Sequence, residues 1–161
     1  MKALKIFSIL TAMLLLTVSC DIIGGKKPVK ISSFVVGSWH LTSYCNMEAN
    51  VDLYITFRSD ASFQILQRTN SMEYQQFSGR YEVAVLTNEE NPELIQHRVN
   101  GIYSDGKAWA NSYICSLDEN GHLVMQSEDD INEVSVYEPT LMPKVAATRT
   151  AEAESSSVKP L

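Results

Sequence analysis

Three histidines are the side chains best suited to acid–base or metal chemistry, and their positions support neither. His40 and His97 lie in segments of alternating polarity and His122 lies in a turn, so no two have the spacing of metal ligands. His97 shares its face with apolar residues, as a core histidine does. No Gly-x-Ser-x-Gly motif, phosphate-binding loop or Cys-x-x-Cys pair occurs. We therefore expect no enzyme activity, no catalytic residue and no cofactor.

Three consecutive carboxylates, Glu128-Asp129-Asp130, offer a second kind of chemistry, the attraction of a cation such as calcium. Calcium needs about six to eight oxygen ligands that converge on one point, and the surrounding spacing matches no calcium loop. We expect a solvated turn and no metal site.

The elements that would position these residues belong to one globular domain. The chain has 161 residues, of which 45% are hydrophobic and 20% are charged, enough for a single core. Its formal net charge is −6. An acidic chain is repelled by phosphate backbones, so we expect no nucleic-acid partner.

Residues 1–19 have the organisation of a signal peptide. Lys2 and Lys5 form the positive region, and an apolar stretch follows from Ile6 to Thr17. This stretch is too short to span a hydrocarbon layer, which needs about twenty residues. We expect cleavage, which removes both lysines and lowers the formal charge from −6 to −8.

The cleavage site, Leu16-Thr17-Val18-Ser19-Cys20, resembles the lipobox of bacterial lipoproteins, with Thr17 where that motif prefers Leu. The resemblance implies that Cys20 becomes the N-terminus and carries a diacylglycerol and an acyl chain such as palmitate. Each buried methylene contributes about 0.8 kcal/mol, so such chains anchor durably. We expect a cell-envelope lipoprotein with residues 20–33 as a lipidated tether. The outer membrane is favoured over the inner one, and the choice of membrane stays open. The leaflet stays open.

The middle of the chain consists of short alternating segments with turn residues between them. Val51 to Phe57 alternates most cleanly, and Asp105-Gly106 predicts a tight hairpin turn. We expect an all-β fold over residues 34–139, an eight-stranded antiparallel up-and-down β-barrel, followed by a disordered tail over residues 140–161. The eight predicted strands are residues 38–45, 51–57, 62–68, 74–85, 94–104, 108–117, 122–127 and 131–138.

Gly37-Ser38-Trp39 opens the first predicted strand, and with eight strands and a lipobox it resembles the lipocalin-like lipoproteins of diderm bacteria. Residues 53–60, 101–106 and 112–117 support the likeness. It implies structural roles for Gly37 and Trp39, with Trp39 plugging the closed end. The last predicted strand lacks the Arg expected to pack over that Trp, and no Thr-Asp-x-Tyr loop occurs. These departures favour a distant lipocalin-like barrel and leave open whether it has a cavity.

The same resemblance sets the orientation, because a first strand that starts at the closed end places alternate connections at the mouth. These are residues 46–50, 69–73, 105–107 and 128–130. Trp109 then lies near the mouth, and Tyr74, Phe77 and Tyr103 reach the same end. We take these four as candidate ligand-binding residues. The alternative is that they pack the core, because an eight-stranded barrel is just wide enough for side chains to fill it.

Once Cys20 is lipidated, Cys45 and Cys115 remain. The predicted topology places Cys45 at the mouth and Cys115 near the closed end, too far apart for a disulfide. We expect two buried thiols. A single miscounted strand would instead bring them together as a disulfide, which an oxidising envelope favours.

Two function classes follow. The first is a monomeric carrier that holds a small apolar or amphipathic ligand at the barrel mouth. The second is a filled barrel that acts as a protein- or glycan-interaction module of the cell envelope. Exposed apolar residues at the rim, with Met47, Met72 and Tyr74 as candidates, would favour the second class.

Overall fold

The computed structural model describes residues 34–68, 73–87, 91, 93–144 and 148–150. All of them belong to one of the two units into which the chain divides, residues 31–161. The predicted signal peptide, Cys20 and the tether lie outside the described residues. Within the described part, the structure contains no apolar helix of membrane-spanning length.

The described residues fold into β-strands without helices, and short turns connect most of them. Val, Ile, Tyr, Phe and Thr at alternating positions account for this choice, because one face of each strand is buried and the other is wet. The strands are β1 (Gly37–Tyr44), β2 (Met47–Glu48), β3 (Asp52–Phe57), β4 (Ser62–Arg68), β5 (Tyr74–Thr87), β6 (Ile95–Tyr103), β7 (Tyr113–Leu117), β8 (Leu123–Ser127), β9 (Val134–Pro139) and β10 (Thr148–Thr150).

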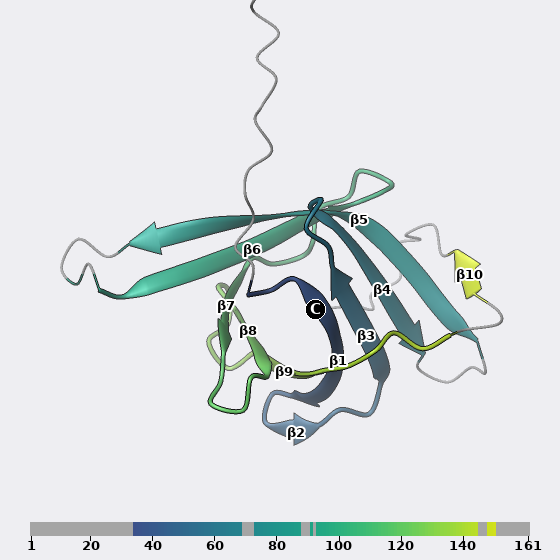
Figure 1. Ribbon diagram of the computed structural model, residues 1–161, viewed down its shortest axis with the longest axis horizontal. Helices are drawn as coiled ribbons and strands as arrows, with labels where there is room; N and C mark the ends of the chain where they lie inside the picture. Colours follow the sequence, from purple (N-terminus) through teal and green to yellow (C-terminus); the bar gives the residue numbers. More distant parts are fainter. Residues whose placement is uncertain (1–33, 69–72, 88–90, 92, 145–147, 151–161) are drawn as a thin grey trace, which may run out of the picture. The chain divides into compact units, whose positions relative to one another are not determined.

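Eight of these strands close into an antiparallel barrel, as the sequence predicts. Each pairs with the next along the chain, in the order β1-β3-β4-β5-β6-β7-β8-β9, and β9 returns to pair with β1. Closure gives each of the eight strands a partner on both sides over part of its length. Figure 1 shows the ring, with β2 as a short extension of β1 and β10 beside β5. β10 lies within the predicted tail and pairs parallel to Tyr74–Gln76.

The barrel interior is filled by side chains. Trp39, Leu41, Ile55 and Phe57 are buried in it, at the alternate positions that the sequence assigns to the inner face. Because the strands tilt, residues far apart in sequence are neighbours across successive strand pairs. One such series of paired residues runs from Gly37 through Phe57 to Tyr103. The buried core consists of Val35, Trp39, Leu41, Leu53, Ile55, Phe57, Phe63, Ile65, Tyr81, Val99, Trp109, Tyr113, Cys115, Leu123, Met125 and Tyr137.

β5 and β6 are longer than their neighbours. β4 accompanies β5 only as far as Arg80, and β7 accompanies β6 only over His97–Val99, whereas β5 and β6 stay paired to Thr87 and Ile95. Figure 1 shows the two strands continuing together beyond the strands beside them. The side of β5 that faces away from β6 therefore has no partner strand from Glu82 to Thr87 among the described residues.

Candidate functional site

Three of the four predicted ligand-binding aromatics form one cluster inside the barrel. Phe63 is its centre, with its ring centroid 5.1 Å from Trp109 and 5.6 Å from Tyr103. Phe77 lies 6.2 Å from Tyr103. Burial raises the pKa of Tyr103, with a contribution from Asp105, so its hydroxyl stays protonated. These rings pack edge to face, as aromatic side chains in a core do.

Trp109 lies deeper than the sequence predicts. Its ring centroid is 6.3 Å from that of Phe57, which ends β3 at the predicted closed end. Trp109 is therefore not at the rim. The ladder between β6 and β7 explains the difference. It runs from His97↔Cys115 to Val99↔Tyr113 and is then interrupted until the single bridge Ile102↔Ala108.

The interruption allows residues 109–112 to leave the wall and Trp109 to turn inward. Its backbone N–H still donates to the Gly101 carbonyl over 2.9 Å, which holds the segment beside β6. The indole covers the inner side of Gly101. Ser112 rejoins the neighbouring wall by accepting a hydrogen bond from the Glu128 N–H.

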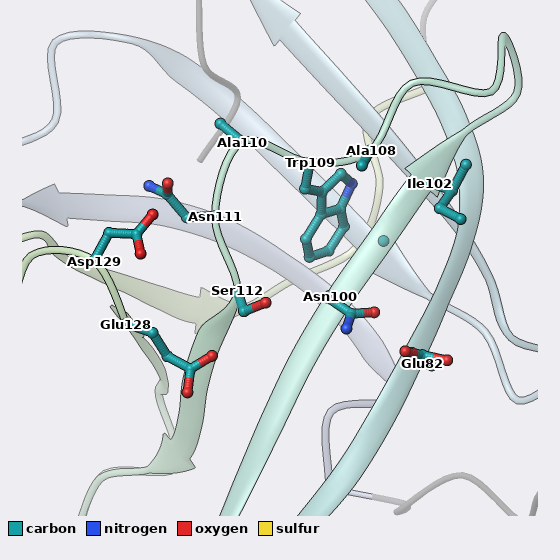
Figure 2. A pocket seen from close by; sticks show the side chains of 11 residues that line it. Glu82, Asn100, Ile102, Ala108, Trp109, Ala110, Asn111, Ser112, Glu128 and Asp129 are labelled. Atoms are coloured by element: carbon teal, nitrogen blue, oxygen red, sulfur yellow. The ribbon is translucent and has the colours of Figure 1, made fainter.

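A hollow of about 420 Å³ lies where residues 109–112 leave the ladder. We call it the Trp109 groove. Figure 2 shows the indole between two sets of side chains. Glu82 and Asn100 are on the β5–β6 side, and Glu128 and Asp129 are on the other. Its volume falls in the usual range for small-molecule sites, about 300–1,000 Å³. The lining residues are Glu82, Asn100, Gly101, Ile102, Ala108, Trp109, Ala110, Asn111, Ser112, Glu128 and Asp129.

The two tryptophans differ in how their indole N–H groups are satisfied. Trp39 Nε1 donates to the Val35 carbonyl over 2.9 Å, consistent with its predicted structural place. Trp109 is only 7% exposed, and its Nε1 has no hydrogen-bond partner among the described residues. A buried donor without an acceptor costs about 1–3 kcal/mol, and native proteins rarely leave one so. Trp109, which lines the groove, therefore encloses a donor that the described residues leave unused.

Three carboxylates, those of Glu82, Glu128 and Asp129, line the same groove. Glu128 is neutralised by Arg98, whose Nε and Nη2 both lie 2.7 Å from its carboxylate oxygens. Glu82 and Asp129 are exposed and have no ion pair within the described part of the chain. No lysine or arginine lines the groove, so its uncompensated charge is negative.

The acidic run of residues 128–130 does not converge on one point. Glu128 pairs with Arg98, whereas Asp130 caps the following turn by accepting a hydrogen bond from the Asn132 N–H over 2.9 Å. Among the described residues, no three His, Cys, Asp or Glu side chains are arranged to hold a metal ion. Glu128 and Asp129 therefore line the groove, whereas Asp130 stabilises a turn.

Tyr74, the fourth predicted ligand-binding residue, is on the other side of the wall, so its expected place with the other three is wrong. Alternation along β5 points Phe77 inward and Tyr74 outward, because the two residues are three positions apart. Tyr74 packs against Tyr54, with ring centroids 6.1 Å apart, and Arg68 lies 4.8 Å above its ring. It is buried on the outer face.

Asp52 is the centre of this outer cluster. Its carboxylate accepts hydrogen bonds from the Tyr74 hydroxyl over 2.5 Å and from Arg68 Nη2 over 2.6 Å. His40 Nε2 lies 3.2 Å from its other oxygen, and Glu138 lies 3.5 Å from His40 Nδ1. Burial alone would raise the pKa of Asp52, but hydrogen bonds from Tyr74, Tyr54 and Arg68 outweigh it and lower the pKa.

A second hollow, also of about 420 Å³, borders this outer cluster between β1 and the segment before β3. It is lined by His40, Thr42, Glu48, Asn50 and Asp52, among others. Thr42 donates to the Val136 carbonyl, and His40 and Asp52 satisfy each other. Because its buried polar groups already have partners, this hollow offers a ligand less than the Trp109 groove does.

Both cysteines that remain in the barrel are free thiols. Cys115 is buried, as predicted, and burial raises its pKa. Cys45 is only half-buried, which corrects the expectation of two buried thiols. It lies in the β1–β2 turn, with a positive φ of 50°.

Sequence reasoning missed Gly101, Glu82 and Asn100 as parts of the groove. Gly101 carried a usable signal, because a glycine on the inner face of a strand marks a place where another group approaches closely. Glu82 and Asn100 carried none. They lie on the outer face of their strands, where polar residues are the rule.

No family model matches this chain, and no curated protein or solved structure matches it either. The closed antiparallel barrel of eight strands is consistent with a lipocalin-like fold.

Proposed function

We propose that this chain is a lipid-anchored lipoprotein of the diderm cell envelope, without catalytic activity, whose barrel binds a small amphipathic ligand in the Trp109 groove. The anchor is Cys20, and the outer membrane is the expected location. The observation that carries the binding proposal is Trp109, which lines a hollow of ligand size and whose enclosed Nε1 has no acceptor among the described residues.

The groove replaces the mouth in this proposal because Trp109 lies in the core and not at the rim. Trp109 packs between Phe57, Phe63 and Tyr113, with centroid separations of 6.3, 5.1 and 6.2 Å. A ligand that reached the indole through the barrel interior would have to displace these rings. A ligand in the groove approaches the indole from the side and must uncover the enclosed Nε1 to bind it.

The groove has an apolar part and a polar part. Ile102, Ala108 and Ala110 surround the indole, whereas Glu82, Asn111 and Asp129 lie farther along the wall. An amphipathic ligand would place its apolar portion near Trp109 and its polar portion against these side chains.

Native mass spectrometry tests the proposal on the chain from residue 21 onward, purified gently from its own host. The expected result is a small molecule that copurifies with the wild type and is lost from Trp109→Phe, which keeps the ring and removes the N–H. Trp39→Phe is the matched control, because Trp39 Nε1 already bonds within the protein.

An adduct that survives in Trp109→Phe would contradict the groove as the binding site. A bare protein mass, unchanged after exposure to envelope extract, would contradict ligand binding altogether. Either outcome would turn attention to the second candidate function.

The second candidate is an interaction module, and the unpaired edge of β5 favours it. Val85 and Ile95 are 58% and 56% exposed on the extension of β5 and β6, with Leu94 beside them at 48%. An unpaired strand with apolar neighbours can accept a strand from a partner protein. Of the rim residues predicted for this role, Met47 is exposed, Tyr74 is buried and Met72 lies outside the described residues.

In vivo crosslinking from position 85 tests this alternative, with the same crosslinker at the exposed turn residue Glu119 as control. A discrete partner captured from position 85 alone would support the module. Equal background at both positions would contradict it.

A further inference from the structure

We infer that the Trp109 groove selects a cationic ligand, one that carries a basic nitrogen and, at a distance from it, a hydrogen-bond acceptor. This inference rests on the proposed function and specifies the chemistry of the same site. It follows from three features of the groove: its charge, its unused donor and the packing of the indole.

The charge comes from two carboxylates that no described residue neutralises. Glu82 on β5 and Asp129 after β8 have no ion pair among the described residues, whereas Glu128 is held by Arg98. Figure 2 shows Glu82 and Asp129 on opposite sides of the indole. A hollow lined by one sign of charge concentrates the opposite charge. An anionic head group, such as a fatty-acid carboxylate, would meet two like charges there.

The donor adds a second requirement, because Trp109 Nε1 needs an acceptor. The nitrogen lies directly over Gly101, where a Cβ would be 2.8 Å from it. In Figure 2 it is on the side of the ring toward Ala108 and Ile102. A carbonyl, ether or hydroxyl oxygen of the ligand would satisfy it. A plain alkylamine would leave it unsatisfied.

The packing of the indole decides how the cation is recognised. Phe57, Phe63 and Tyr113 surround the ring inside the barrel, and the side chain is only 7% exposed. Its faces are therefore not available for a cation–π contact, which needs the charge over the ring. The carboxylates bind the basic nitrogen, and the indole edge binds the acceptor.

A set of matched probes tests the inference by NMR of the wild-type chain from residue 21 onward. The protein has two tryptophans, so it gives two indole N–H resonances, and Trp109→Phe identifies one of them. Trp39 is the internal reference. The probes are aminocaproamide, caproamide and adipic acid monoamide, which share an amide carbonyl on a similar chain and end in an ammonium, a methyl and a carboxylate.

The expected result is that aminocaproamide shifts the Trp109 resonance with a Kd about tenfold lower than that of adipic acid monoamide, with caproamide between them. The double variant Glu82→Gln, Asp129→Asn should reduce this preference to about twofold. Glu119→Gln, on an exposed turn, should leave it unchanged.

Equal affinity for the three probes would overturn the cationic selection and leave the proposed binding site standing. A tenfold preference that persists in the double variant would overturn the role of Glu82 and Asp129. If no probe shifts the Trp109 resonance, both the inference and the proposed groove are wrong.

Discussion

Trp109 and Gly101 fit against each other so closely that a Cβ on residue 101 would lie 2.5 Å from the indole Cε2 and 2.8 Å from Nε1. The glycine is what allows the indole to enter the barrel. The absence of a side chain at one position therefore sets both the packing of the core and the position of the donor in the groove.

Gly101→Ala is expected to destabilise the protein by about 1–3 kcal/mol, because the methyl group must displace the indole or the strand. The indole should also become more exposed. Denaturant unfolding measures the first effect and the tryptophan emission maximum measures the second.

Gly37→Ala is the matched control, and it is expected to change stability by less than about 1 kcal/mol. A Cβ at residue 37 would lie 3.4 Å from the Trp39 ring, an ordinary contact. The glycine of the Gly-x-Trp motif is thus not required by sterics here. Equal losses from both variants would contradict this assignment.

The two barrel thiols are expected to react differently. Iodoacetamide should modify Cys45 and spare Cys115 in the folded protein, because burial raises the pKa of Cys115 and shields it. Mass spectrometry of the chain from residue 21 onward should show one adduct when folded and two after denaturation without reductant. A single adduct or none after denaturation would contradict the free thiols.

The barrel itself could be predicted because its rule is local. Strict alternation in Val51 to Phe57 and turn residues such as Asp105-Gly106 mark strands and hairpins without any long-range information. Because each strand pairs with the next one along the chain, the last strand, β9, is left to pair with β1 and close the barrel. The inward direction of Phe77 could also be predicted from alternation along its strand, and Phe77 pairs with the buried Ile65.

The candidate site could be predicted only in part, because it arises where the alternation fails. The β6–β7 ladder is interrupted between Val99 and Ile102, and this places Trp109 in the core instead of at the rim. No local sequence pattern predicts such an interruption. Tyr74 was misplaced for a related reason. It precedes Phe77 by an odd number of residues, and its burial on the outer face depends on Arg68 and Asp52 from other strands.

Stability is expected to fall in acid through Asp52. Its pKa in the folded protein is lowered, so its contribution is fully present above the unfolded value of about 3.9 and is lost as the pH falls through the folded value. Asp52→Asn should therefore be less stable than the wild type at neutral pH. The difference should shrink below about pH 4.

Thermal unfolding of both proteins between neutral and acidic pH measures this effect. Glu119→Gln, in an exposed turn, is the control and should follow the wild type. A constant difference between Asp52→Asn and the wild type at every pH would mean that packing, and not the charge of Asp52, carries the contribution.

The anchor is expected to depend on one sulfur atom. Cys20→Ser removes the acceptor for the diacylglycerol, so the protein should move from the membrane fraction to the soluble fraction of a diderm host. Its mass should equal that of the bare polypeptide, without lipid. The barrel should keep its circular dichroism spectrum, because its first strand begins at Gly37, after the tether. Wild-type protein that resists carbonate extraction, beside a Cys20→Ser variant that does not, would support the lipobox. If both remain membrane-bound, the uncleaved leader rather than a lipid holds the chain, and the expected N-terminus at Cys20 is wrong.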